Sequence, residues 1–167
     1  MVRPITLNDA QGLLDYFAKL VRIDPERVER PQDVDKITLE AELTYIQKRL
    51  ELQKTGEIVL RCVEKQGAII AFGEVERLKR WIERHVAEIR FGVYPHEAHE
   101  AIALVGELEA LAKKIGVEVL IYFHLATQKA SLDVMHQCGY KEVGRVKGYY
   151  KRNGELIDRI YLSKSLK

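Results

Sequence analysis

Histidine and glutamate side chains crowd one short stretch, YPHEAHEA, at residues 94–101. Such side chains bind zinc and act as general bases, so the stretch first suggests metal chemistry. The zinc-protease signature H-E-x-x-H places its histidines four residues apart on one helix face, whereas His96 and His99 are three apart. The spacing therefore argues against a metal site. It leaves an anion-binding loop or an ordinary helix start at Pro95.

The composition is that of an ordinary globular protein. The chain has 167 residues, 47% hydrophobic and 31% charged, with a formal net charge of +2. This length favours one domain, expected over residues 1–167. The small net charge argues against nucleic acid as a partner. Cys62 and Cys138 lack metal-type spacing and no stretch approaches ~20 apolar residues, so we expect a reduced, cytoplasmic protein with no membrane anchor.

The hydrophobic pattern alternates between helical and strand-like segments. Apolar residues at helical spacing predict helices at about 9–20, 39–55, 99–115 and 128–138. Alternating or continuous apolar runs predict strands at 2–6, 57–65, 68–79, 84–94, 117–123, 140–150 and 155–164. The polar segment 21–37 is expected to be a long connection, and Asn8 is expected to cap the first helix.

This order of elements predicts the fold class. The segments 84–94, 99–115 and 117–123 form a βαβ unit, which requires parallel strands joined by a right-handed crossover. The expected α/β fold is a mixed, twisted sheet of about seven strands flanked by about four helices. A ligand is expected beyond the carboxyl end of strand 84–94, at the N-terminus of the next helix.

Five local patterns cover most of the chain. They are GEIVLRCVEKQGAIIAFGEV, HVAEIRFGVYP, GELEALAKKIGVEVL, QKASLDVMHQCGYKEVGRV and YYKRNGELIDRIYLSKSL. In this register they resemble the GNAT superfamily of N-acetyltransferases. The resemblance implies one domain that binds acetyl-coenzyme A (acetyl-CoA) and moves its acetyl group to an amine, with no metal. The acceptor, a small metabolite or a protein amine, is not named by these patterns.

The pyrophosphate-binding loop of this superfamily reads R/Q-x-x-G-x-G/A, and YPHEAHEA departs from it. An ungapped register places His96, His99 and Ala101 at the defined positions, of which only Ala101 fits. A gapped register beginning at Ala98 is the alternative. The residues expected to contact the pyrophosphate, chiefly through backbone N–H groups, are His96, His99, Glu100, Ala101 and Ile102.

The charges of this loop have mixed consequences for an anion. The negative charges of Glu97 and Glu100 oppose a pyrophosphate, and partly protonated histidines offset some of that effect. A bulky residue at position 99 hinders close approach of the ligand. The sequence therefore predicts the fold more firmly than the affinity for the coenzyme.

Glu88 is the first candidate for a catalytic base. It lies in strand 84–94 on the face opposite Ile89, and its Ala-Glu-Ile context resembles the general-base glutamate of the histone-acetyltransferase branch. A carboxylate there could accept the proton of the amine, directly or through water. Glu74 and Glu76 on the preceding strand are alternatives. A solvated glutamate paired with a cation across the strand is the simpler interpretation of each.

The superfamily's usual general acid is a tyrosine, and that position is Met135 here. A methionine cannot donate a proton, so Tyr150 is the substitute expected, with Tyr122 and Tyr149 as alternatives. Packing of a hairpin is the simpler interpretation of Tyr149 and Tyr150. A thiolate with a pKa near 8.5 could also leave without a dedicated acid.

The resemblance also assigns the pantetheine arm of the coenzyme. The main chain of Phe91, Gly92 and Val93 would bind it, and Gly92 would permit close approach. Gln128 falls at an asparagine position where an amide can bind the arm, and Ser131 falls at a small-residue position. A helix start and plain surface are the simpler interpretations of these two.

These observations favour an acetyl-CoA-dependent N-acetyltransferase acting on a primary amine, with a homodimer as a possible assembly. The main alternative is a GNAT-like protein that binds acyl-CoA or a partner in a regulatory role, which the altered loop and Met135 favour. A small metal-dependent hydrolase built on HEAHE is a third hypothesis, opposed by the histidine spacing.

Overall fold

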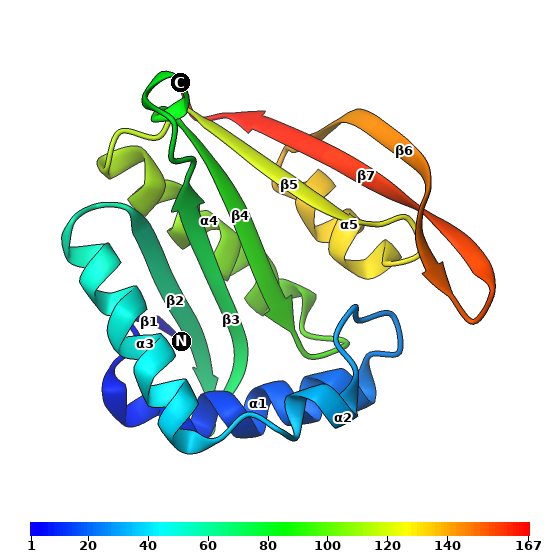
Figure 1. Ribbon diagram of the computed structural model, residues 1–167. Coiled ribbons are helices and arrows are strands. Elements are labelled where there is room, and N and C mark those ends of the chain that lie inside the picture. The colour runs from blue at the N-terminus through cyan, green and yellow to red at the C-terminus, as the bar shows by residue number, and fades with distance from the viewer.

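The computed structural model describes residues 1–167 and contains one twisted seven-stranded sheet (Figure 1). The strands are β1 (Val2–Arg3), β2 (Ile58–Lys65), β3 (Ala68–Arg77), β4 (Val86–Val93), β5 (Val119–Leu125), β6 (Lys141–Arg152) and β7 (Glu155–Ser165). Their order is β1-β2-β3-β4-β5-β7-β6. Neighbours are antiparallel except β4 and β5, which are parallel. The predicted mixed sheet of about seven strands is confirmed.

Five helices accompany the sheet, one more than the sequence predicts. They are α1 (Ala10–Ile23), α2 (Pro31–Val34), α3 (Leu39–Lys54), α4 (Ala98–Lys114) and α5 (Lys129–Gln137). The additional helix, α2, is a single turn inside segment 21–37, where Pro31 occupies a first-turn position that needs no N–H donor. No helix combines the length and apolar character needed to cross a bilayer.

Helices pack against both faces of the sheet. α4 and α5 lie behind the sheet in Figure 1, over the larger apolar core, whereas α1 and α3 lie in front of the half that contains β1 to β3. Leu104 and Leu108 lie on the core face of α4 and are completely buried. A Cβ atom at Gly73 would lie 2.8 Å from Leu108 Cδ1, so this glycine permits the close packing of α4 on β3.

The parallel pair β4 and β5 separates along its length. The two strands are paired only where Val86–Glu88 face Val119–Ile121. Beyond Glu88 they diverge, which opens the middle of the sheet toward the carboxyl ends of both strands (Figure 1). This divergence lies at the edge where the sequence predicts a ligand.

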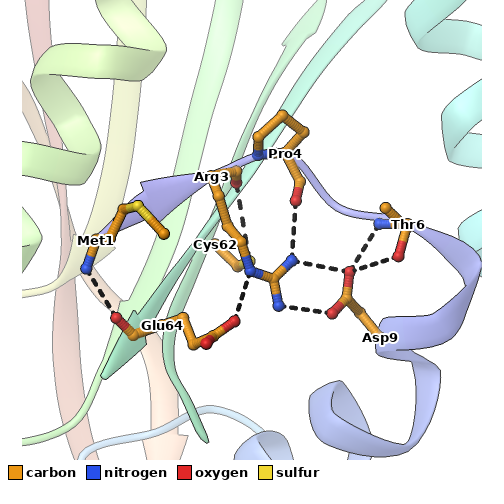
Figure 2. A network of polar contacts seen from close by, with 7 residues as sticks. All are labelled: Met1, Arg3, Pro4, Thr6, Asp9, Cys62 and Glu64. Atoms are coloured by element: carbon orange, nitrogen blue, oxygen red, sulfur yellow. Dashed lines mark hydrogen bonds and ion pairs between the residues drawn. The ribbon is translucent and has the colours of Figure 1, made fainter. Parts of the chain in front are cut away.

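A polar network fixes the entry into α1 (Figure 2). The guanidinium of Arg3 donates to Asp9 at 2.7 and 3.0 Å and to Glu64 Oε2 at 2.7 Å. Thr6 caps the 3₁₀ turn Leu7–Asp9 and forms a capping box with Asp9. The expected cap at Asn8 is therefore wrong, because the helical turn begins earlier and Thr6 has the extended backbone of an N-cap.

Replacement of Asp9 by asparagine is expected to lower the free energy of unfolding at neutral pH by about 1–3 kcal/mol. The hydrogen bonds from Arg3 hold the pKa of Asp9 below its usual range. The ionised form is therefore favoured by folding, and this contribution is present above pH ~4 and lost as the pH falls through the lowered pKa of the folded state. Urea unfolding of both proteins across this range measures the difference.

Asp35→Asn is the matched control. Asp35 pairs with Arg22, and about half of each side chain is exposed, so this variant should change the free energy of unfolding by less than ~1 kcal/mol. Equal effects of the two substitutions, or a loss in Asp9→Asn that persists at pH 2, would contradict the assignment.

Candidate functional site

A cavity of about 760 Å³ reaches into the gap between β4 and β5. Its lining includes Arg90 and Phe91 from β4, and Tyr122 and Phe123 from β5. Successive residues of a strand point to opposite faces of a sheet. The cavity therefore contacts both faces of both strands where they are no longer paired, and an elongated ligand could enter from one face and meet a second ligand on the other.

The front wall of the cavity is formed by α1 and α3. These helices contribute Tyr16 and Phe17 from α1, and Tyr45 and Ile46 from α3. Gly92 of β4 permits the approach of α1, because a Cβ atom at this position would lie 2.5 Å from the hydroxyl oxygen of Tyr16. Side chains of α1 therefore fill the space beside Gly92.

Three glutamates face this side of the sheet, and two of them each bind both Arg49 and Arg90. Glu74, only 4% exposed, binds Arg49 at 2.6 Å and Arg90 at 3.1 Å. Glu76 binds the same two arginines at 3.0 and 2.8 Å. Glu88 has one partner, Arg90 Nε at 3.2 Å.

Glu88 is the glutamate at the start of the gap, outside the lining of the cavity, which includes Glu74. It is the last residue of β4 paired with β5, so it lies where the gap begins. Burial raises the pKa of Glu88 above its usual value, and the nearby charges of Arg90 and Arg159 offset only part of that rise. A carboxylate with a raised pKa accepts a proton more readily than an ordinary carboxylate does.

All three candidate tyrosines line the cavity, Tyr122 from β5 and Tyr149 and Tyr150 from β6. Tyr150 comes from β6, and its ring lies 4.8 Å from that of Tyr149. Tyr122 comes from β5, stacks on Phe91 and is buried. Burial raises the pKa of both Tyr122 and Tyr150, so each is a neutral hydrogen-bond donor at physiological pH. Met135 is completely buried in the core.

Buried polar atoms without partners gather at the carboxyl end of β5 and the start of α5. They are the hydroxyl of Tyr122, Nε2 of His124 and both amide atoms of Gln128. Burial lowers the pKa of His124 to about 3, so its imidazole is neutral. Buried polar groups in folded proteins nearly always have a hydrogen-bond partner, so these atoms are available to bond with a water or with a ligand. Sequence reasoning found Gln128 but missed His124, the last residue but one of a largely apolar strand.

The stretch YPHEAHEA contains the turn that follows β4 and the first turn of α4. Glu97 and Glu100 both bind Lys65 of β2, at 2.7 and 3.3 Å, so a cation offsets their charge. His96 and His99 are exposed, and the left-handed backbone conformation, φ +70°, occurs at His96 and not at His99. Position 99 is therefore helical, and a glycine is not needed there for the backbone to turn.

The first turn of α4 presents free donors. The main-chain N–H groups of Ala98 and His99 have no hydrogen-bond partner, and no side chain caps the helix. Ala101 is completely buried and Ile102 packs against the core. No group of three or more His, Cys, Asp or Glu side chains is arranged to hold a metal ion.

The topology brings most of the predicted site residues to one edge. Because β4 and β5 are parallel, their carboxyl ends lie at the same edge of the sheet, with Val93 and the turn into α4 beside Leu125 and the turn into α5. Phe91, Gly92 and Tyr150 line the cavity. Ser131 is partly exposed on α5.

Comparisons with known proteins agree with this geometry. The family model described as "Acetyltransferase (GNAT) domain" matches residues 2–161. A GNAT-family acetyltransferase from Streptococcus pneumoniae superposes with a TM-score of 0.86 at 15% identity, over 100% of this chain and 99% of that one.

Two further structures are similar. An N-acetyltransferase from Staphylococcus aureus Mu50 gives a TM-score of 0.84 at 15% identity, covering 100% and 98% of the two chains. A candidate acetyltransferase from Salmonella typhimurium, solved with its cofactor acetyl-CoA, gives 0.83 at 14% identity, covering 100% and 94%. No curated protein sequence matches. With the family model spanning nearly the whole chain, this protein belongs to the GNAT acetyltransferase family.

Proposed function

We propose that this protein transfers the acetyl group of acetyl-CoA to a primary amine. The observation that carries the proposal is the cavity that enters the gap between β4 and β5 beyond Glu88 and contacts both faces of the sheet. Such a gap lets a thioester and an amine meet from opposite sides. Acetyl-CoA in the similar structure from Salmonella typhimurium supports the choice of donor.

The residues at the carboxyl edge fit the chemical groups of the coenzyme. The free N–H groups of Ala98 and His99 suit a pyrophosphate, as the positive end of the α4 dipole does. Lys65 removes much of the repulsion from Glu97 and Glu100. The pyrophosphate is therefore proposed to lie over the first turn of α4, next to His96, His99, Glu100, Ala101 and Ile102.

The pantetheine arm is proposed to lie in the gap between the strands. The main chain of Phe91, Gly92 and Val93 borders the gap on β4, beyond the last residue paired with β5. Gln128 and Ser131 lie on the opposite border, where the buried amide of Gln128 lacks a partner. A polar, extended arm would satisfy that amide.

The proposed mechanism uses Glu88 and Tyr150. Glu88 takes a proton from the ammonium group, directly or through one water, and leaves a neutral amine. The amine nitrogen then bonds to the thioester carbonyl carbon, the carbon–sulfur bond breaks, and the thiolate leaves with the electron pair. The nitrogen gives its second proton to water and becomes the amide. Tyr150 donates a hydrogen bond to the leaving sulfur, and a proton from Tyr150 or water completes the thiol.

Replacement of Gln128 by leucine is expected to weaken the binding of acetyl-CoA without lowering the melting temperature. The side chain is 3% exposed and both amide atoms lack partners, so an apolar side chain of similar volume should leave the melting temperature equal or higher. The Kd for acetyl-CoA should rise about 5- to 10-fold, because one hydrogen bond of about 1 kcal/mol is lost. Unchanged affinity would contradict the assignment of Gln128 to the coenzyme.

Calorimetric titration with acetyl-CoA tests the donor directly. Saturable binding in the micromolar range is expected, weakened by Lys65→Glu, which would concentrate negative charge at the loop. Absence of binding at millimolar acetyl-CoA would overturn the proposal. Binding without turnover of any amine would favour a regulatory acyl-CoA-binding protein, the function that the replacement of the usual acid by buried Met135 supports.

A further inference from the structure

Arg159 is the one arginine of the cavity without a carboxylate partner. The other three are paired, Arg27 with Glu29 at 3.1 Å, and Arg49 and Arg90 with the glutamates of β3 and β4. The guanidinium of Arg159 instead lies 3.5 Å from the centre of the Phe123 ring and 4.6 Å from that of Tyr149, and its Nε is buried without a hydrogen-bond partner. A partly desolvated cation of this kind is a site for an anion.

Arg159 is positioned to hold such an anion close to the reacting amine. Arg159 is paired with Leu125 at the carboxyl end of β5 and lines the cavity. Its guanidinium lies over the ring of Phe123, two residues beyond Ile121, which is the residue of β5 that pairs with Glu88. It also lies beside the ring of Tyr149, the neighbour of Tyr150 in β6. An anionic group bound by Arg159 would therefore be close to a nitrogen that gives its proton to Glu88.

Most of the remaining lining of the cavity is hydrophobic. Of its 26 lining residues 17 are hydrophobic, including Phe17 and Tyr45 on the helical wall. Glu42 of α3 also lines the cavity, has no ion-pair partner and carries a pKa raised by burial. The wall opposite the sheet therefore favours an apolar group and disfavours a second anion.

We propose that the acceptor is a primary amine with a carboxylate beside its nitrogen and an apolar remainder, as in an α-amino acid with an aliphatic or aromatic side chain, and that Arg159 binds the carboxylate. The proposal rests on the proposed acetyltransferase function. A guanidinium forms two parallel hydrogen bonds with a carboxylate, which would orient the amine toward Glu88. The coenzyme also carries anionic oxygens, so the test separates the two sources of negative charge.

Matched acceptors, each with and without the carboxylate, provide the test. Steady-state kinetics would compare L-leucine with 3-methylbutylamine, and L-phenylalanine with 2-phenylethylamine, in the wild type, Arg159→Gln and Arg159→Lys. In the wild type kcat/KM should be at least about 10-fold higher for the amino acids. Arg159→Gln should lower kcat/KM for the amino acids about 30- to 100-fold and change that of the decarboxylated amines little, with Arg159→Lys intermediate.

The alternatives give distinct results. A higher KM for acetyl-CoA in Arg159→Gln, with acceptor preference unchanged, would assign the guanidinium to the coenzyme and overturn the proposal. Equal losses for both members of each pair, with a lowered melting temperature, would mean that Arg159 only packs against the aromatic rings. Wild-type acetylation of amines without preference for the carboxylate would overturn this inference and leave the proposed function standing. Absence of acetylation of any amine would overturn both.

Discussion

Replacement of Glu88 by glutamine is expected to lower kcat about 10²- to 10³-fold and to leave the Kd for acetyl-CoA unchanged. The amide keeps the size of the side chain and its position at the start of the gap, but it cannot accept the proton of an ammonium group. The raised pKa of Glu88 adds a signature in the pH dependence. In the wild type kcat/KM should fall as the pH drops through a value above ~4.3, because the carboxylate becomes protonated. The variant should lack this limb.

Glu76→Gln is the matched control for that experiment. Glu76 lies directly opposite Glu88 on β3 and faces the same side of the sheet. It binds two arginines, Arg49 and Arg90, whereas Glu88 binds only Arg90. Its kcat should therefore remain within a few-fold of the wild type. Unchanged turnover in Glu88→Gln would remove Glu88 as the base, and an equal loss in both variants would indicate a general effect of charge on this face.

Replacement of Arg49 by methionine should give the largest loss of stability, about 3 kcal/mol in the free energy of unfolding. The Arg49 side chain is 13% exposed and that of its partner Glu74 is 6% exposed. The substitution leaves Glu74 with Arg90 and the hydroxyl of Tyr45. A buried carboxylate that loses its principal partner keeps most of its desolvation cost. Chemical denaturation at neutral pH measures the change.

Two further variants decide whether the ion pair is the cause. Arg22→Met removes an arginine whose pair with Asp35 is about half exposed, and should cost less than ~1 kcal/mol. Adding Glu74→Gln to Arg49→Met should recover part of the lost stability, because the uncompensated charge is removed. A double variant less stable than Arg49→Met would contradict this account.

Local sequence pattern determines most of the fold. The periodicity of 99–115 predicts α4 within one residue at each end, and the turns Gln66-Gly67 and Asn153-Gly154 adopt the left-handed conformations that two-residue hairpins require. The exceptions are the single turn of α2 and the cap at Thr6. Both depend on a few local hydrogen bonds that periodicity does not record.

The candidate site was predictable only where residues adjacent in sequence define it. The alternation of β4 places Glu88 and Arg90 on one face, and the start of α5 identifies Gln128. The pairing of Arg49 with Glu74 spans 25 positions, and that of Lys65 with Glu97 spans 32. Such contacts form only when the helices pack on the sheet. The sequence therefore did not indicate that Lys65 offsets the charge of Glu97 and Glu100, or that Arg159 lacks a carboxylate partner.

Acetyl transfer from acetyl-CoA to a defined amine tests the central claim most directly. Thiol release and the mass of the product would be followed together, with a panel of amines that includes L-leucine and L-phenylalanine, for the wild type and Glu88→Gln. The account predicts an N-acetylated product and stoichiometric free thiol in the wild type, with a rate lowered about 10²-fold or more in the variant. Binding of acetyl-CoA without an acetylated product from any amine would contradict it.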